Sequence, residues 1–380
     1  MREKKDRVFG LDLIRAIAIT LVLISHVSLF FPNYNNVITD SFQVFGLYGV
    51  EIFFVLSGFL IGGILLELIK VTSFSFKNVC NFWVRRWFRT LPLYFLVLSI
   101  NVLLVFIVED ELPKKLWKYC LFLQNFYNEY LIFFPESWSL SIEEYAYILA
   151  PLGLFFISKM GISLKVKRES MFLISAIIFS ALCVVLKIVF HCNNIDDNQN
   201  FITWNINLKS MVVYRLDAIF IGFILVYFFK KYQLFFEKQK WKFAVIGSIV
   251  IMCLLVSIVY YPINSENSLY WNVFFLPLNS IAISLLLPFL YYLNFNYKTV
   301  KAFIERVSLY SYSMYLLHYS FAYYLIKHLI NLGELDLLDS FLITIVYLII
   351  VYFLSKASYL FYEKPMTDLR DSKTIKRYFN

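Results

Sequence analysis

The sequence predicts an all-α polytopic membrane protein with about ten transmembrane helices and both termini in the cytoplasm. Three observations predict it. Of the 380 residues, 60% are hydrophobic and only 16% are charged, a composition that excludes an ordinary soluble globular protein. Apolar runs of about 20 residues, the length that a helix needs to cross a bilayer, recur along the whole chain. Lys and Arg residues gather in alternate connecting segments, as the positive-inside rule describes.

The first span carries two ionisable side chains. The run from 9 to 31 contains Arg15 and His26, exceeds a signal-peptide core in length and lacks a small-residue cleavage site, so it should remain as a helix. Their separation of eleven residues is about three helical turns plus 20°, which puts both on one face about 16 Å apart. Because such groups normally face a bundle interior or a water-filled cavity, we expect this helix to form one wall of a site.

The later spans follow in order along the chain. An even number of spans puts both termini on one side, and 27 of the 35 Lys and Arg residues lie in segments that this arrangement places in the cytoplasm. The longest connection, about 110 to 140, is rich in aromatic residues, and we expect it to fold back onto the bundle. The approximate bounds of the later spans are 48–69, 92–109, 141–158, 171–190, 212–229, 243–261, 272–293, 309–330 and 340–361.

The chain is predicted to form one domain. It has no internal repeat and no Pro/Ser-rich linker, so we expect a single transmembrane domain over 1–365 and a short basic cytoplasmic tail over 366–380. The five cysteines show no CxxC or metal-ligand spacing, so neither a disulfide framework nor a metal site is expected. The net charge of +9 follows from membrane topology, and no nucleic-acid partner is expected.

Ionisable residues inside the spans form two groups by depth. Groups this deep are functional candidates, and an imidazole with a carboxylate in reach is typical of general base catalysis at neutral pH. His318 lies close to mid-depth on its own helix. Towards the outer side we place His26, Glu51, Glu143, Glu144, Arg215 and Asp217, and towards the cytoplasmic side Arg15, Arg85, Arg86, Arg89 and Glu363.

The arginines between 85 and 89 have two interpretations. They could be a positive-inside signal and nothing more. Arg86 and Arg89, however, are three residues apart and therefore neighbours on one helical face, just before Pro92, where we expect a span to begin. A fixed basic face suits a ligand that carries phosphate groups.

Three other candidates also have structural alternatives. His318 could be a buried histidine bonded to a neighbouring helix. Ser57 with Gly58 is more typical of a close helix contact than of a nucleophile. Arg215 and Asp217 could form structural ion pairs with other groups, because side chains two residues apart on a helix do not face each other.

The paired glutamates and two lysines have similar alternatives. Glu143 or Glu144 could be a first-turn acid that stabilises a helix N-terminus after a cap at Ser139 or Ser141. The lysines at 187 and 327 are expected to extend along the helix surface towards the membrane boundary.

These motifs, in this order, resemble the acyltransferase-3 family of integral-membrane O-acyltransferases. The resemblance covers nearly the whole chain, and seven motifs in collinear order at these spacings leave little room for chance. The matching stretches are LDLIRAIAITLVLISH with Arg15 and His26, GVEIFFVLSGFLI at 49–61, RRWFRTLP from Arg85 to Pro92, SWSLSIEEYAYILAP from 137 with Glu143 and Glu144, YRLDAIFIGFIL with Arg215, Asp217 and Gly222, SLYSYSMYLLH ending at His318, and YEKP with Glu363 and Pro365.

The resemblance implies transfer of an acyl group, usually acetyl, from cytoplasmic acyl-CoA to a hydroxyl of a cell-surface or lipid-linked glycan in a bacterial plasma membrane. O-antigen, exopolysaccharide, peptidoglycan, a glycolipid or a secondary metabolite are possible acceptors on family grounds. Longer members carry a soluble extracytoplasmic domain similar to SGNH hydrolases, whereas this chain stops within about 20 residues of its last span. If such a domain is needed, we expect it from a separate partner.

The resemblance also suggests roles for the site residues. The arginines at 85, 86 and 89 are expected to hold the CoA phosphates, and Arg15 to line the donor channel. His26 is expected to act as general base on the acceptor hydroxyl, with Glu143 or Glu144 orienting it. Direct attack would need no acyl-enzyme, and a covalent relay through Ser57 is the less favoured route.

Two other function classes fit part of the pattern. A transporter or flippase of lipid-linked saccharides would also have a polar cavity with titratable residues, although no inverted repeat is visible. A membrane-bound acyltransferase of the unrelated lipid- and protein-modifying group would also use a buried His, but the spacing of Arg15 and His26 on the first helix discriminates against it.

Overall fold

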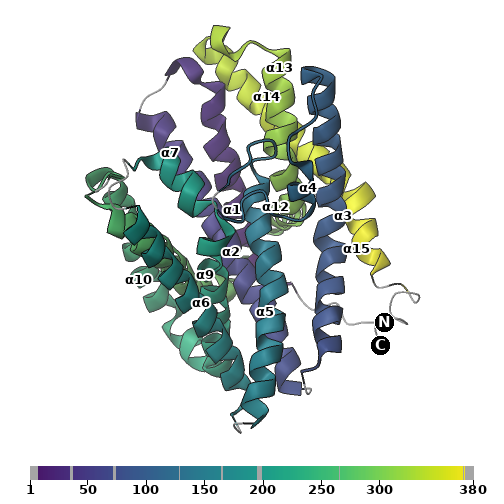
Figure 1. Cartoon of the computed structure of the whole chain (residues 1–380). Helices are drawn as coiled ribbons and strands as arrows, with labels where there is room; N and C mark the ends of the chain where they lie inside the picture. Colours follow the sequence, from purple (N-terminus) through teal and green to yellow (C-terminus); the bar gives the residue numbers. More distant parts are fainter. Residues whose placement is uncertain are drawn as a thin grey trace.

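The computed structural model describes residues 7–34, 37–71, 74–127, 129–163, 166–194, 199–264, 266–370 and 372. Within these ranges every regular element is helical (Figure 1), which confirms the predicted all-α fold. Nine helices in the described chain are long and apolar enough to cross a membrane. The long helices are α1 Phe9–Val27, α2 Val37–Val71, α3 Phe76–Glu109, α5 Ser137–Ser163, α6 Arg168–Asn193, α9 Asp217–Lys231, α10 Gln233–Tyr260, α11 Leu276–Tyr291, α12 Lys298–Leu317 and α14 Leu337–Ser358.

Short helical segments extend or connect the long ones. The predicted span at 309–330 lies in a helical run made of α12, η5 and α13, which is absent from the nine because its many Tyr and Ser residues and His318 lower its hydropathy. The short segments are η1 Ser28–Phe30, η2 Pro32–Tyr34, α4 Leu116–Cys120, α7 Phe201–Trp204, η3 Asn205–Lys209, α8 Val212–Arg215, η4 Tyr270–Phe275, η5 His318–Tyr323, α13 Tyr324–Leu329, η6 Leu332–Glu334, η7 Tyr359–Glu363 and α15 Lys364–Leu369.

The third span differs from its predicted start at Pro92. Helix α3 begins at Phe76 and passes through Pro92 without a break. Proline interrupts one backbone hydrogen bond, but membrane helices tolerate it where neighbouring groups replace the lost partner. The arginines at 85–89 therefore belong to a long helix within the bundle and not to a connecting segment.

The long connection at 110–140 packs against the bundle, as predicted. Tyr119 and Phe134 are completely buried in it. The side chain of Gln124 donates hydrogen bonds to Ser137 and Ser141 on α5. The side chain of Asn125 donates to the carbonyl oxygens of Trp138 and Ser210. These bonds fix the start of α5.

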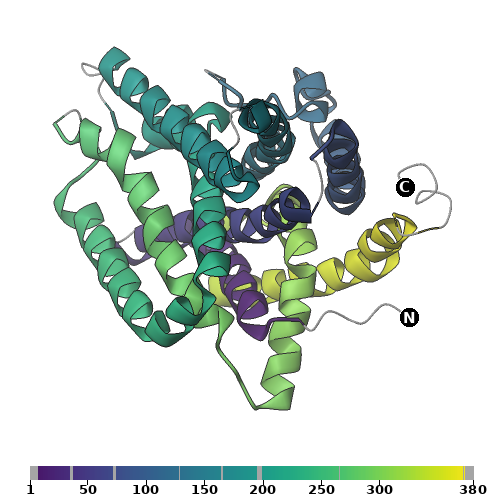
Figure 2. The ribbon, with the colours of Figure 1, turned by 90° about the horizontal axis from the view of Figure 1, so that it is seen from below.

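Helices α1 and α2 occupy the middle of the bundle (Figure 2), whereas α10 lies at its edge and buries little of its surface. The two ends of the described chain lie at one side of the bundle, because Arg7 and the α15 region line the same cavity. The predicted tail from 366 is helical as far as Leu369, where Thr367 and Asp368 line that cavity. Residues 371 and 373–380 of the tail lie outside the described residues.

Helices α2 and α9 approach each other closely at two glycines. A Cβ atom on Gly58 would lie 2.0 Å from the carbonyl oxygen of Ile219, and one on Gly222 would lie 2.4 Å from the carbonyl oxygen of Val55. Neither helix can accept a side chain there without moving. The prediction that Gly58 marks a close helix contact is therefore confirmed.

The contact predicts that Gly58→Ala destabilises the protein by about 1–3 kcal/mol, the usual range for overpacking. Gly63→Ala is the matched control, because a Cβ on Gly63 of the same helix would meet Val226 at 3.5 Å, an ordinary contact distance. Thermal unfolding of both variants in detergent measures the difference. Equal unfolding temperatures for the two variants would contradict the packing account.

Candidate active site

Two cavities lie next to each other in the bundle. The larger has a volume of about 790 Å³ and the smaller about 300 Å³. Val50 and Tyr315 line both cavities, so these two residues form part of the wall between them. Helix α1 runs along both, with Arg15 in the larger and His26 in the smaller. The first helix therefore forms a wall of each cavity.

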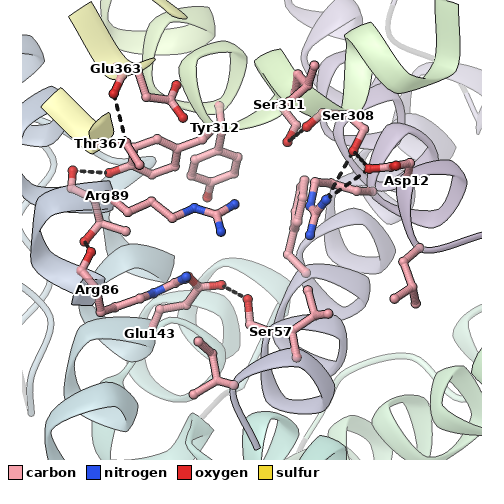
Figure 3. Close-up of a pocket in the computed structure, with 18 of the residues that line it drawn as sticks. Asp12, Ser57, Arg86, Arg89, Glu143, Ser308, Ser311, Tyr312, Glu363 and Thr367 are labelled. Carbon is pink, nitrogen blue, oxygen red and sulfur yellow. Dashed lines mark hydrogen bonds and ion pairs between the residues drawn. The ribbon is translucent and has the colours of Figure 1, made fainter. Parts of the chain in front are cut away.

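The larger cavity is basic. Figure 3 shows Arg86 and Arg89 entering it from α3, with Asp12 and Ser308 on the opposite side. The Arg89 side chain extends towards the middle of the cavity, and its guanidinium group makes no hydrogen bond to any residue that the structure describes. The positively charged lining residues are Arg7, Arg15, Arg86, Arg89, Lys364 and Arg370, and the negatively charged ones are Asp12, Glu143, Glu363 and Asp368.

Arg86 is fixed by its neighbours. Its guanidinium group donates a hydrogen bond to the Tyr147 hydroxyl and lies 4.2 Å from the centre of the Tyr147 ring. It also forms an ion pair with Glu143 at 3.8 Å. Arg85, in contrast, is exposed and does not line the cavity. Only two of the three predicted arginines therefore share the basic face.

Arg15 is held beside Asp12 and Ser308. Its guanidinium group donates to the Ser308 hydroxyl at 3.2 Å and to Asp12 at 3.5 Å. Asp12 also accepts hydrogen bonds from Arg7, whose pKa is raised by this contact. Asp12 was not among the sequence candidates, although its position three residues before Arg15 on a helix predicts an ion pair between the two side chains.

The two glutamates of α5 occupy different surroundings. Glu143 accepts hydrogen bonds from the Ser57 hydroxyl at 2.8 Å and from the Tyr147 hydroxyl at 2.6 Å, and it lines the larger cavity. Glu144 accepts a hydrogen bond from Thr90 and is buried. Neither contacts His26 in the described structure, so the predicted orienting contact between a glutamate and His26 is not present here.

The capping interpretation of these glutamates is wrong. Helix α5 begins at Ser137 and not at 141, so both glutamates lie beyond its first turn. Ser139 lies inside the helix and donates to the Tyr315 hydroxyl at 2.7 Å. Ser141 also lies inside the helix and donates to the carbonyl oxygen of Ser137. The helix starts early because Gln124 and the long connection hold its first turn.

The smaller cavity brings two histidines together. The rings of His26 and His318 lie edge to face, with their centres 4.7 Å apart. The Nδ1 atom of His26 is 2.9 Å from the carbonyl oxygen of Val22, and that of His318 is 2.7 Å from the carbonyl oxygen of Tyr315. A carbonyl oxygen accepts only, so each Nδ1 carries the hydrogen in the neutral ring. Each Nε2 atom is left with a free lone pair, as a general base requires.

His26 and His318 differ in accessibility. His318 is completely buried, and its Nε2 atom has no hydrogen-bond partner. His26 is partly exposed to the cavity. His26 is therefore the imidazole that a molecule in the smaller cavity reaches first.

Two charged residues of the smaller cavity escaped the sequence analysis. Glu136 accepts hydrogen bonds from the backbone N–H and the hydroxyl of Ser320, which is 184 residues away in the chain. Burial raises the pKa of Glu136 to about 7, although these hydrogen bonds lower it. Lys209 lies at the end of the π-helical turn η3. Burial, and to a smaller extent the Arg215 charge, lower the pKa of Lys209 to about 8.

A third group of charges is completely buried away from both cavities. Glu51 pairs with Arg215 and accepts a hydrogen bond from Ser280, and Asp217 pairs with Lys187. Arg215 also lies 3.9 Å from Asp217, because the chain turns at Leu216 between α8 and α9. The structural interpretation of Arg215 and Asp217 is confirmed. The expectation that Lys187 extends to the membrane boundary is wrong, because its side chain is 0% exposed.

The arrangement can bring two molecules together. A ligand with phosphate groups fits the basic cavity, where Arg89 has no competing hydrogen bond. A polar, ring-shaped ligand fits the smaller cavity, which combines histidines with aromatic side chains. Val50 and Tyr315 border both cavities, so molecules bound in the two would lie on either side of these residues.

Comparisons with known proteins identify similar chains. A family described as an acyltransferase domain matches residues 8–359. A candidate O-acetyltransferase of Staphylococcus aureus (strain COL) is 25% identical over 331 residues, which cover 82% of this chain and 50% of that protein. No solved structure matches significantly.

Two relatives are named for peptidoglycan. The candidate peptidoglycan O-acetyltransferase YrhL of Bacillus subtilis (strain 168) is 30% identical over 46% of this chain and 28% of its own. The peptidoglycan O-acetyltransferase OatA of Listeria monocytogenes serovar 1/2a is 28% identical over 42% of this chain and 26% of its own. The alignments span half or less of the length of these curated relatives.

Proposed function

We propose, from the premise that this chain belongs to the acyltransferase 3 family, that it moves an acetyl or other short acyl group from acyl-CoA to a hydroxyl of a glycan. The observation that carries the proposal is the pair of adjoining cavities, one basic and one holding His26, with Val50 and Tyr315 in the wall of both. The names of the relatives support acetyl as the acyl group and peptidoglycan as one possible acceptor. The bacterial sources of the relatives support a location in the bacterial plasma membrane.

The donor is proposed to lie in the larger cavity. Acyl-CoA has an anionic nucleotide end and a slim arm that ends in the thioester. Arg89 would bind the phosphates by charge-assisted hydrogen bonds, and Arg86, fixed by Tyr147 and Glu143, would present a charge of defined position. Arg15 would line the path towards the shared wall.

The chemical step is proposed to be direct. The Nε2 atom of His26 removes the proton of the acceptor hydroxyl while that oxygen attacks the thioester carbonyl carbon. The carbon–oxygen bond forms, the carbon–sulfur bond breaks, and the departing CoA thiolate takes the proton from the imidazolium. Val22 keeps the ring oriented through its carbonyl oxygen, which is the role predicted for a glutamate. The Ser57 hydroxyl donates to Glu143, which makes Ser57 part of the donor-side hydrogen-bond network.

A transfer assay tests the function. Purified protein in detergent, given radiolabelled acetyl-CoA and a soluble peptidoglycan fragment, should release CoA and label the fragment in an alkali-sensitive ester. A flippase would instead need a membrane with two sides. Absence of CoA release and of labelled ester with every glycan tried would overturn the proposal.

Arg89→Met is expected to weaken acetyl-CoA binding by about tenfold or more, because a charge-assisted hydrogen bond to phosphate is lost. Arg85→Met is the matched control, since Arg85 lies on the same helix and is exposed, as Arg89 is, but does not line the cavity. Titration of acetyl-CoA into each purified variant gives the affinities. Equal affinities for the two variants would mean that Arg89 does not bind the phosphates and that these arginines only set the membrane topology.

A further inference from the structure

The smaller cavity contains one ammonium group without a counter-ion. The Lys209 Nζ atom donates a hydrogen bond to the Asn205 side chain at 2.8 Å and lies 4.6 Å from the centre of the Trp138 ring. Among the described residues it has no carboxylate partner. Glu136, the carboxylate found in the lining of this cavity, is instead bonded to Ser320.

The environment of Lys209 disfavours an unpaired positive charge. Burial and the Arg215 charge lower its pKa to about 8, so the ammonium form is less stable here than in water. The buried cluster of charges beside this region already balances two positive charges with two negative ones, because Arg215 and Lys187 are paired with Glu51 and Asp217. An anionic group on a ligand would supply the charge that the protein does not.

The remaining lining suits a sugar. Four aromatic side chains, Trp138, Tyr130, Tyr319 and Phe201, line the cavity, and its volume of about 300 Å³ is at the lower end for small-molecule sites. His26 stands in the same cavity, with its Nε2 lone pair available. Asn205, one helical turn before Lys209 on η3, holds the ammonium group in place before a ligand arrives.

From this arrangement we propose that the acceptor is an anionic glycan, whose carboxylate or phosphate group binds Lys209 while a neighbouring hydroxyl faces His26. The inference rests on the proposed function, because it assigns the smaller cavity to the acceptor. It adds a chemical class, an acidic or phosphorylated sugar, and a residue, Lys209, that selects it. Neutral sugars lack the group that would compensate the Lys209 charge.

A labelling experiment tests binding without any acyl transfer. The full-length protein in detergent at pH 8 is treated with formaldehyde and a borane reductant, and methylation of Lys209 is followed by peptide mass spectrometry. Methyl glucuronide, glucose 1-phosphate and methyl glucoside serve as carboxylate, phosphate and neutral probes. Either anionic probe should slow the methylation of Lys209 about tenfold at saturation, while methyl glucoside should not. The exposed Lys327 is the internal reference, whose rate should stay constant.

A transfer experiment then tests selection. Lys209→Met should lower the ratio of kcat/KM for the charged probe to that for methyl glucoside by about tenfold or more, whereas Lys209→Arg should keep it within about threefold. Protection of Lys209 without transfer to any probe would leave the anion site standing and overturn the proposed function. Transfer to methyl glucoside at the same rate as to the charged probes, with no protection of Lys209, would overturn this inference and leave the function standing.

Discussion

Replacement of His26 by Gln is expected to lower acyl transfer about 10²- to 10⁴-fold, the usual contribution of a general base. The Gln side chain can still donate to the carbonyl oxygen of Val22, which His26 contacts at 2.9 Å. It has no basic nitrogen, so the proton of the acceptor hydroxyl has no acceptor on the protein. The loss should appear in kcat more than in the KM for acetyl-CoA, because His26 lies outside the donor cavity.

His318→Gln is the comparison that assigns the base. Both imidazoles present a free Nε2 lone pair, but His318 is completely buried and His26 opens to the cavity. We therefore expect a smaller loss for His318→Gln than for His26→Gln. The two variants are measured side by side with labelled acetyl-CoA, at equal amounts of folded protein. A larger loss of acyl transfer for His318→Gln would assign the general base to His318 and not to His26.

The sequence predicted what depends on local helix geometry. The positions of Arg15 and His26 along one helix follow from the rise per residue, and the structure places them in two adjoining cavities. The shared face of Arg86 and Arg89 follows from the same geometry, whereas the absence of Arg85 from the cavity lining was not predicted. These inferences needed no knowledge of which helices are neighbours.

Contacts between distant parts of the chain were not predictable in this way. Depth in the membrane and the family resemblance suggested that Glu143 or Glu144 pairs with His26, but depth does not fix the direction of a side chain around the helix axis. Glu143 faces Ser57 and Arg86 instead. Glu136 meets Ser320 across 184 residues, and nothing in the local pattern around Glu136 indicates that contact.

The buried ion pairs show the same limit of a single sequence. The position of Lys187 near the end of an apolar span predicts a side chain that extends to the membrane boundary. Its partner Asp217 lies on another helix, and both side chains are almost completely buried. The preference of a long side chain for the boundary was overridden by a carboxylate that only the folded bundle brings within reach.

Arg215→Met is expected to lower the free energy of unfolding by about 3–5 kcal/mol, because it leaves Glu51 buried without its cation. Adding Glu51→Gln should recover a large part of this loss, since the second change removes the uncompensated charge. Lys230→Met is the control for a surface pair: Lys230 and Glu67 are 34% and 53% exposed, and such pairs contribute about 1 kcal/mol or less.

Thermal unfolding in detergent compares the stability of the parent, the Arg215→Met variant, the double variant and the Lys230→Met control.

The double variant also tests whether the Glu51–Arg215 pair positions residues of the site. Glu51 is next to Val50, which lines both cavities, and Arg215 lies 5.7 Å from the ring of Phe54, which lines the larger one. If the pair positions α2, the stable double variant should still show a raised KM for acetyl-CoA. A single Arg215→Met variant as stable as the parent would show that the cluster of buried charges does not hold the bundle together.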